Sequence, residues 1–264
     1  MVTFLIANII YYLIISIPFV FAFKLWYSSK KVKPIIISID GNIGSGKSTL
    51  IKILQDELCK NSNIVFLQEP VNEWIEISDG KSNILSNFYQ DKKRWSYTFQ
   101  NFAFITRSKM LLDAIKNNTT SLQEKRKVII TERSTETDKN IFAKMLHDEG
   151  SINDLEFKIY NYWYDNIMKS NKINNIIYLR TTPKDAYKRI DGRGRQEEKE
   201  IPLDYIQTIH EYHDKWLVEG TKNSNICYID GNDDFQNNEK VKKNIVKSIS
   251  VFINSLESRF YLPS

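Results

Sequence analysis

The chain has 264 residues, a hydrophobic content of 42% and a formal net charge of +5. This length and composition fit one sizeable α/β domain with a short extension. Residues 1–33 contain four lysines and no acidic residue, so they carry +4 and leave +1 for the rest of the chain. An almost neutral main body argues against a nucleic-acid-binding protein, and no nucleic-acid partner is expected.

The N-terminal segment is almost wholly apolar between residues 4 and 23, which matches the roughly 20 residues that span a bilayer core. We therefore predict a single transmembrane helix. The lysines after it place the main domain in the cytosol, as a single-pass membrane protein. Residues 1–33 would form a membrane anchor with a basic juxtamembrane part, and residues 34–264 the main domain. A dispensable extension and a start codon assigned too far upstream are the alternatives.

After Pro34, short β-branched runs alternate with longer helical patterns, which is typical of a parallel sheet built from βαβ units. Strands are predicted at residues 35–39, 64–67, 128–131, 176–179 and 226–229. Helices are predicted at residues 47–60, 92–117, 136–148, 153–169, 183–190, 202–217 and 239–256. The sequence thus predicts an α/β fold with a five-stranded parallel sheet flanked by helices.

A glycine-rich motif follows the first predicted strand and opens the first predicted helix. It reads Gly41, Asn42, Ile43, Gly44, Ser45, Gly46, Lys47, Ser48 and Thr49. In this context the backbone N–H groups surround the phosphates of a nucleoside triphosphate, while Lys47 reaches the β- and γ-phosphates and the Ser48 hydroxyl faces Mg²⁺. No Asn-Lys-x-Asp guanine motif is present, and Glu132 replaces the usual aspartate at the end of the third strand. A P-loop kinase for small molecules is therefore favoured over a GTPase or a motor.

Charged residues follow the second and third strands directly. Glu69-Pro70-Val71 and then Trp74 come after the second strand, and Glu132-Arg133-Ser134 comes after the third. Ligands of open parallel sheets bind at the carboxyl ends of the strands, so both motifs are expected to converge on the phosphate loop. A helix cap or loop acid remains an alternative for Glu69, and a buried structural ion pair for Glu132 and Arg133.

Three arginines, Arg189, Arg193 and Arg195, lie close together beside Gly192 and Gly194. We predict an arginine-rich lid that folds over the phosphates, spreads negative charge and excludes water. A solvated basic face is the alternative.

These motifs resemble those of the deoxyribonucleoside kinase family, which includes deoxycytidine, deoxyguanosine and insect multisubstrate kinases. The resemblance runs from about Pro34 to the last helix. It also rests on Tyr89, Trp95, Phe99, Gln100, Asp138, Glu197, Glu198, Ile201, Pro202 and Leu203. It implies ATP-dependent 5′-phosphorylation of 2′-deoxyribonucleosides in nucleotide salvage, with Mg²⁺, and a homodimer.

The resemblance implies roles for the residues that handle phosphate. Glu69 would be the general base for the 5′-hydroxyl, Glu132 would bind Mg²⁺ together with Ser48, and Arg133 would stabilise the transferring phosphoryl group. Arg193 and Arg195 would also stabilise the negative charge of the transferring phosphoryl group. Arg189 and the loop residues Asp233, Asp234 and Phe235 would bind the donor nucleotide, although Asn-Asp-Asp is also ordinary turn chemistry.

The resemblance also implies roles in binding the acceptor. Tyr89 and Glu198 would hold the 3′-hydroxyl, and Trp74, Gln100, Arg107 and Asp138 would surround the base. A charged Arg107–Asp138 pair is similar to that of the deoxycytidine and deoxyguanosine kinase branch, which implies that thymidine is a poor substrate. The alternatives are a surface tyrosine at position 89 and a surface salt bridge between Arg107 and Asp138.

Two rival functions remain. A thymidylate or other nucleoside monophosphate kinase would share the fold, but Val71, Trp74 and the arginine-rich lid argue against it. A non-catalytic nucleotide-binding module tethered to a membrane would need no general base, so the presence of Glu69 argues against it.

Overall fold

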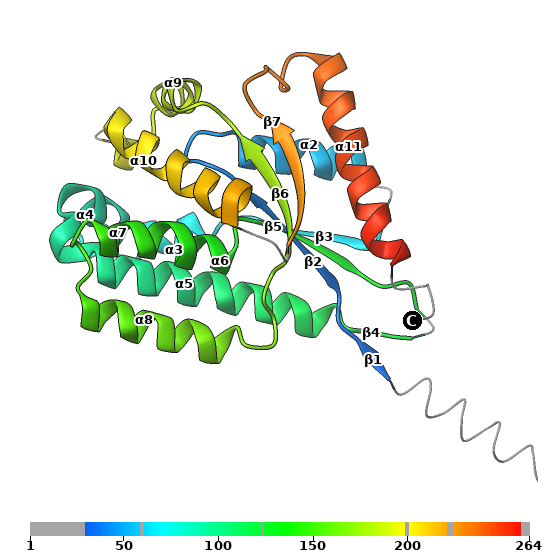
Figure 1. The fold of residues 1–264 in the computed structure, drawn as a ribbon, viewed down its shortest axis with the longest axis horizontal. Helices are drawn as coiled ribbons and strands as arrows, with labels where there is room; N and C mark the ends of the chain where they lie inside the picture. The colour runs from blue at the N-terminus through cyan, green and yellow to red at the C-terminus, as the bar shows by residue number, and fades with distance from the viewer. Residues whose placement is uncertain (1–29, 59–60, 123, 199–200, 221–223, 260–264) are drawn as a thin grey trace, which may run out of the picture.

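The computed structural model describes residues 30–58, 61–122, 124–198, 201–220 and 224–259 (Figure 1). The first half contains β1 (Lys31–Val32), β2 (Ile35–Asp40), α2 (Lys47–Leu58), β3 (Ile64–Leu67), α3 (Val71–Glu76), α4 (Ile84–Gln90), α5 (Lys92–Asn117), β4 (Thr120–Ser121) and β5 (Val128–Glu132). The second half contains α6 (Thr135–Thr137), η1 (Asp138–Ala143), α7 (Lys144–Asp148), α8 (Asp154–Ile167), β6 (Asn175–Arg180), α9 (Pro183–Arg193), η2 (Gln196–Glu198), α10 (Leu203–Asp214), η3 (Lys215–Gly220), β7 (Asn225–Asp230) and α11 (Glu239–Ser258).

The main sheet has five parallel strands in the order β3-β5-β2-β6-β7, which confirms the predicted α/β architecture. Its register pairs Ile39 of β2 with Glu132 of β5, and Leu67 of β3 with Thr131. The carboxyl ends of these three strands therefore lie side by side. The phosphate loop and the two charged motifs all follow these ends, so the sheet brings them to one edge.

Helices cover both faces of the sheet because its strands are apolar on both sides (Figure 1). Ile35, Ile37 and Ile39 of β2 pack in one cluster with α2 and α11. On the opposite face Ile129 of β5 packs with α5 and α8, and Ile176 of β6 packs with η3. The alternation follows the two-residue period of a strand.

Several short elements were not predicted. Strands β1 and β4 form a separate antiparallel pair, and α3 and α4 lie between β3 and α5. The predicted helix at 136–148 is present but is a π-helix over η1. Segments this short contain too few residues to show a hydrophobic periodicity. The start of α4 is set by an N-cap, because Oδ1 of Asn83 accepts from the Ser86 N–H at 2.8 Å.

The prediction of a single-pass membrane protein is contradicted, and nothing supports the membrane as a partner. In the parts of the chain that the structure describes, no helix is both long and apolar enough to cross a membrane. The segment on which the prediction rested, residues 4–23, lies outside the described residues. An apolar run of suitable length satisfies the composition of a span but does not establish one.

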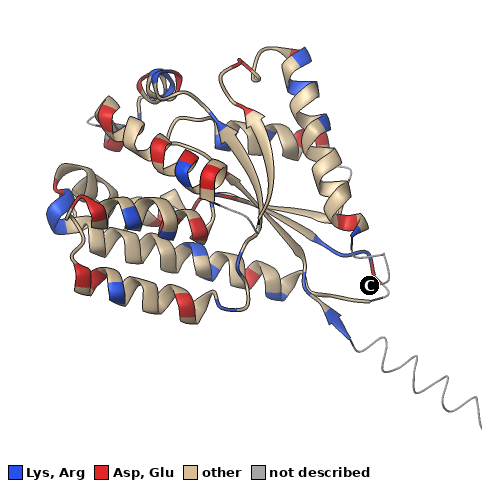
Figure 2. Ribbon diagram, in the orientation of Figure 1, with Lys and Arg blue, Asp and Glu red and all other residues tan. Residues whose placement is uncertain are grey.

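Charged side chains of both signs are interspersed along the outer helices. Figure 2 shows this mixture along α8, where Lys158 lies between Glu156 and Asp165, and at the junction of α10 and η3, where Lys215 follows Asp214. On these helices, acidic and basic residues are therefore mixed and do not form one acidic and one basic face.

Candidate active site

The phosphate loop is packed so closely that glycine is required at two of its positions. Gly44 has a φ of +75°, and a Cβ atom there would lie 2.2 Å from the backbone oxygen of Ala186 in α9. Gly46 has a φ of +98°, and its Cβ would lie 2.8 Å from the ring of Phe235. Both glycines therefore permit a left-handed backbone and close contact with neighbouring elements. The loop leads into α2 at Lys47.

Lys47 lies buried against the phosphate loop. Its Nζ donates to the backbone oxygens of Gly41 at 3.1 Å and Asn42 at 2.8 Å. Burial, with a further contribution from the nearby Arg133 cation, lowers the pKa of Lys47 to about 7. A phosphate group beside Nζ would favour the charged form again, so this lysine is suited to binding an anion.

Ser48, in the first turn of α2, contacts Glu132, the last residue of β5, and its hydroxyl donates to Oε1 of Glu132 at 2.6 Å. A hydroxyl and a carboxylate are oxygen ligands that suit Mg²⁺. Among the described residues, no cluster of three or more His, Cys, Asp or Glu side chains could hold a metal ion. The pair therefore fits a magnesium ion that takes its remaining ligands from phosphate oxygens and water, as Mg²⁺ usually does.

Glu69 is held by two arginines through the same oxygen. Its Oε1 accepts from Nη2 of Arg107 at 3.0 Å and from Nε of Arg133 at 3.1 Å. Burial on its own would raise the pKa of Glu69, but Arg133 and Arg107 outweigh it and lower this pKa to about 2. Glu69 is therefore a firmly positioned, ionised carboxylate, and no hydrogen bond to Oε2 occurs within the described residues.

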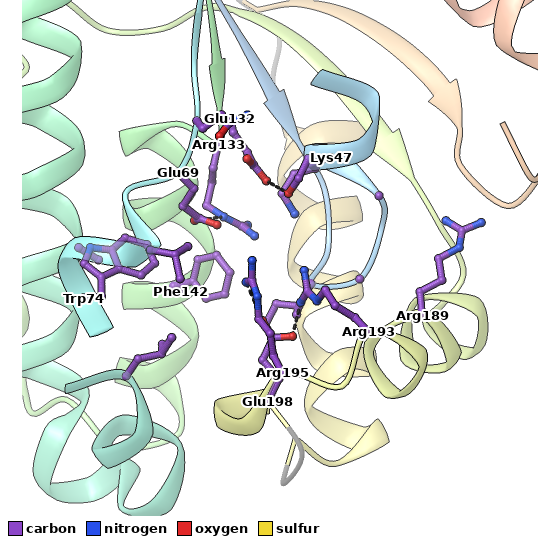
Figure 3. A pocket seen from close by; sticks show the side chains of 18 of the residues that line it. Lys47, Glu69, Trp74, Glu132, Arg133, Phe142, Arg189, Arg193, Arg195 and Glu198 are labelled. Carbon is purple, nitrogen blue, oxygen red and sulfur yellow. Dashed lines mark hydrogen bonds and ion pairs between the residues drawn. The ribbon is translucent and has the colours of Figure 1, made fainter. Parts of the chain in front are cut away.

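Arg133 adopts a left-handed backbone conformation with a φ of +65°, alone among the described residues other than glycine. Such a conformation is unfavourable for a side chain of this size and clusters at functional sites. The following residue is anchored, since the Ser134 N–H donates to Oδ1 of the buried Asp40 at 3.1 Å. This tight turn sends Arg133 towards Glu69, as Figure 3 shows. The sequence motif predicted Arg133, but it did not indicate Asp40 as the anchor.

Arg107 and Asp138 form a buried, two-point ion pair. Nε of Arg107 donates to Oδ2 of Asp138 at 2.8 Å and Nη2 donates to Oδ1 at 3.2 Å, with both side chains 2% exposed. Burial would lower the pKa of Arg107, but its ion pairs with Asp138 and Glu69 raise it. The surface salt bridge that the sequence left open is therefore excluded. Arg107 connects Asp138 on η1 to Glu69 after β3.

One cavity of about 720 Å³ is lined by these groups and runs from the phosphate loop to Trp74 and Gln100. Trp74, whose Nε1 donates to Oγ1 of Thr106 at 3.0 Å, forms part of its wall together with Gln100. Phe142 also lines the cavity, and the Arg133 guanidinium lies 4.8 Å from its ring centre. Figure 3 shows Trp74 and Phe142 on the same side of the cavity. The sequence did not indicate Phe142, because an apolar residue inside a helix is usually interpreted as part of the hydrophobic core.

The arginine-rich segment that was predicted to form a lid contains the last turn of α9 and continues into η2. Gly194, with a φ of +63°, ends α9 in the left-handed conformation. Glu198 pairs with Arg193 and, at 3.3 Å, with Nη1 of Arg195. Tyr89 of α4 lines the same cavity, and burial together with the Glu198 carboxylate raises the pKa of its hydroxyl. The structure thus brings Tyr89 and Glu198 to one region from distant parts of the sequence.

Of the residues predicted to bind the donor nucleotide after the phosphate loop, Arg189 lines the cavity. Arg189 donates to the backbone oxygens of Ser45 and Asn232, both at 3.1 Å, and Phe235 is buried against the phosphate loop. The loop residue that lines the cavity is Gln236, whereas Asp233 and Asp234 are not among the lining residues described. Oδ1 of Asp234 instead accepts from the backbone N–H of Gln236 at 3.2 Å, which is ordinary turn chemistry.

Comparison with known proteins gives a consistent picture. The family model for deoxynucleoside kinases matches residues 37–254. A protein of fowlpox virus named as a probable deoxycytidine kinase is 41% identical over 226 residues, covering 83% of this chain and 88% of its own length. Human deoxycytidine kinase is 32% identical, with 83% and 91% covered, and Xenopus laevis mitochondrial deoxyguanosine kinase is 30% identical, with 87% and 93% covered. Because the family model spans nearly all of the main body, the chain belongs to the deoxynucleoside kinase family.

Proposed function

We propose that this enzyme transfers the γ-phosphate of ATP, bound with Mg²⁺, to the 5′-hydroxyl of deoxycytidine and of purine deoxynucleosides, as a step of nucleotide salvage. The observation that carries the proposal is the Asp138–Arg107–Glu69–Arg133 network, which lines the same cavity as the phosphate loop. This network connects Arg107 and Asp138, which are suited to binding a base, with the carboxylate of Glu69, which would lie beside the phosphates.

The reaction needs one bond to form and one to break. The 5′-oxygen bonds to the γ-phosphorus while the bond from that phosphorus to its bridging oxygen breaks, and ADP leaves. The proton of the 5′-hydroxyl passes to Glu69, whose Oε1 is fixed by two arginines. Bound Mg²⁺ would be held by Ser48 and Glu132 and would neutralise phosphate charge. Lys47, Arg133, Arg193 and Arg195 supply further positive charge around the same cavity.

The acceptor would be held at both of its ends. Tyr89 and Glu198 bind the 3′-hydroxyl, and a ribose 2′-hydroxyl would meet the Tyr89 side of the cavity. At the other end, Gln100 is almost fully buried and lines the cavity, so its amide is available to a base edge. Asp138, although paired with Arg107, also lines the cavity and favours an exocyclic amino group, which cytosine and adenine both offer.

Phosphate transfer from labelled ATP tests this function against that of a nucleoside monophosphate kinase. The purified protein would be offered the four deoxynucleosides and, in parallel, deoxycytidine and thymidine monophosphates. We expect label on deoxycytidine, deoxyadenosine and deoxyguanosine, little on thymidine, and none on the monophosphates. Label on the monophosphates alone would identify the rival activity.

We further infer that the chain forms a homodimer through one side of α8. Large apolar residues, Leu155, Ile159, Tyr162 and Trp163, recur along this helix and are 39–67% exposed. Ile105 of the adjacent α5 is also half exposed. Apolar groups gathered in this way mark interaction surfaces, and a self-complementary patch suits two-fold association.

Replacing Trp163 with Glu is expected to convert the dimer to a monomer, because a charge would then be buried without a partner in the interface. Light scattering of the purified protein gives the mass directly. The matched control is Val251→Glu on α11, which changes an equally apolar and exposed position at a distant helix, where Val251 is 61% exposed. A dimer that persists in Trp163→Glu, or is lost equally in Val251→Glu, would contradict this interface.

A further inference from the structure

A polar contact joins η2, in the arginine-rich lid, to the residue that caps α4. Nδ2 of Asn83 donates to Oε1 of Glu197 at 3.3 Å. The orientation of this amide is fixed by its other end, since Oδ1 accepts from the N–H of Ser86 at 2.8 Å and from the Ser86 hydroxyl at 3.0 Å. A carboxylate only accepts hydrogen bonds, so the amide nitrogen of Asn83 is the group that matches it.

Each partner of this contact belongs to, or caps, the same short element as a residue that the proposed function uses. Asn83 caps α4, and Tyr89 lies further along the same short helix. Glu197 directly precedes Glu198 in η2. Glu198 also forms ion pairs with Arg193 and Arg195. The two residues assigned to the 3′-hydroxyl therefore come from separate elements, α4 and η2, and the Asn83–Glu197 bond lies between those elements.

We propose that the Asn83–Glu197 hydrogen bond is a latch that sets the separation of Tyr89 and Glu198, so that both meet the 3′-hydroxyl of one nucleoside. Asn83 and Glu197 are thus positioning residues that act through Tyr89 and Glu198. The inference rests on the proposed 3′-hydroxyl site. When the latch breaks, η2 and its Glu198 shift relative to α4, and one contact to the 3′-hydroxyl is lost. A nucleoside without that hydroxyl has no such contact to lose.

The test is Asn83→Asp, which keeps an oxygen to cap Ser86 but turns the donor towards Glu197 into a like charge. The measured quantity is the ratio of kcat/KM for deoxycytidine to that for 2′,3′-dideoxycytidine. We expect this ratio to fall about tenfold, mainly because the KM for deoxycytidine rises. A tenfold change is the size expected for losing a hydrogen bond to a charged group. The second variant, Asn83→Asp with Glu197→Gln, restores a donor and should return the ratio to near the wild-type value.

Two further variants separate the possible causes. Asn153→Asp makes the same change at the cap of α8, where Oδ1 of Asn153 accepts from the Glu156 N–H at 3.0 Å, and should leave the ratio unchanged. Tyr89→Phe should lower the ratio whether or not the latch exists. If Tyr89→Phe lowers it but Asn83→Asp does not, or if Glu197→Gln fails to rescue Asn83→Asp, the latch is wrong and the sugar site stands. If Tyr89→Phe has no effect, the proposed sugar site and the latch fail together.

Discussion

Replacing Glu69 with Gln is expected to lower turnover by about 10²–10⁴-fold while nucleoside binding is retained. The amide keeps the shape of the side chain and one oxygen for Arg107 and Arg133, which lie 3.0 and 3.1 Å from Oε1 in the wild type. It cannot accept the proton of the 5′-hydroxyl. The loss should therefore appear in kcat and much less in the nucleoside dissociation constant.

The low pKa of Glu69 is compatible with this role. A carboxylate whose pKa is about 2 is a weak base and stays ionised at neutral pH. Phosphoryl transfer passes through a loose transition state, in which the attacking oxygen needs little negative charge before the bond to phosphorus forms. The proton can therefore move late, when the 5′-oxygen has become acidic. Ionisation and fixed placement then matter more for Glu69 than basicity.

The measurement is steady-state kinetics with saturating ATP and deoxynucleoside, together with a direct binding isotherm for the nucleoside. Glu73→Gln is the matched control, because Glu73 is an exposed acid on the neighbouring helix α3 and does not line the cavity. It should behave as the wild type. Turnover above half of the wild-type value in Glu69→Gln would remove Glu69 from the reaction.

The parts of the fold with strong local signals could be predicted from the sequence. The five strands of the main sheet are short, mostly apolar runs, and the phosphate loop has its glycines at fixed spacing between a strand and a helix. The convergence of Glu69 and Arg133 follows from a general property of parallel sheets, because both residues come after neighbouring strands. These features depend on nearby residues or on topology alone.

Other parts of the site depend on contacts that the sequence does not display. Asp40 reads as the end of a strand, yet it anchors Ser134 and so helps to fix the turn at Arg133. Phe142 reads as a core residue, yet it lines the cavity. Asp234 resembles a ligand residue of the donor loop, but its carboxylate serves the backbone of its own turn. Long-range packing decides the roles of Asp40 and Phe142, whereas the contacts of Asp234 lie within its own turn.

Base preference is the property that the Arg107–Asp138 pair is expected to control. In the buried pair, each Asp138 oxygen already accepts from Arg107, and the charged pair lines the cavity, at the end where the base is proposed to bind. Thymine would present a carbonyl there where cytosine and adenine present an amino group, together with an adjacent methyl group. An unpaired buried polar group costs about 1–3 kcal/mol, or roughly 5- to 150-fold in affinity. We therefore expect the wild-type kcat/KM for thymidine to lie below that of deoxycytidine and deoxyadenosine. Guanine also presents a carbonyl at this edge but has no methyl group beside it, so deoxyguanosine is expected to exceed thymidine as well.

The double change Arg107→Met with Asp138→Ala should shift this preference towards thymidine. Both residues must be replaced together, because removing one leaves the other as an uncompensated buried charge, at a cost of about 3–5 kcal/mol in stability. Glu69 keeps its second partner, Arg133, in the double variant. The matched control is Lys109→Met with Asp113→Ala, which removes an exposed ion pair of 3.1 Å from the same helix, α5, and should leave the ranking of bases unchanged. Competition between the four deoxynucleosides measures their relative kcat/KM. A wild-type enzyme that prefers thymidine would show that Arg107 and Asp138 do not select the base. A double variant that ranks the four bases as the wild type does would show the same.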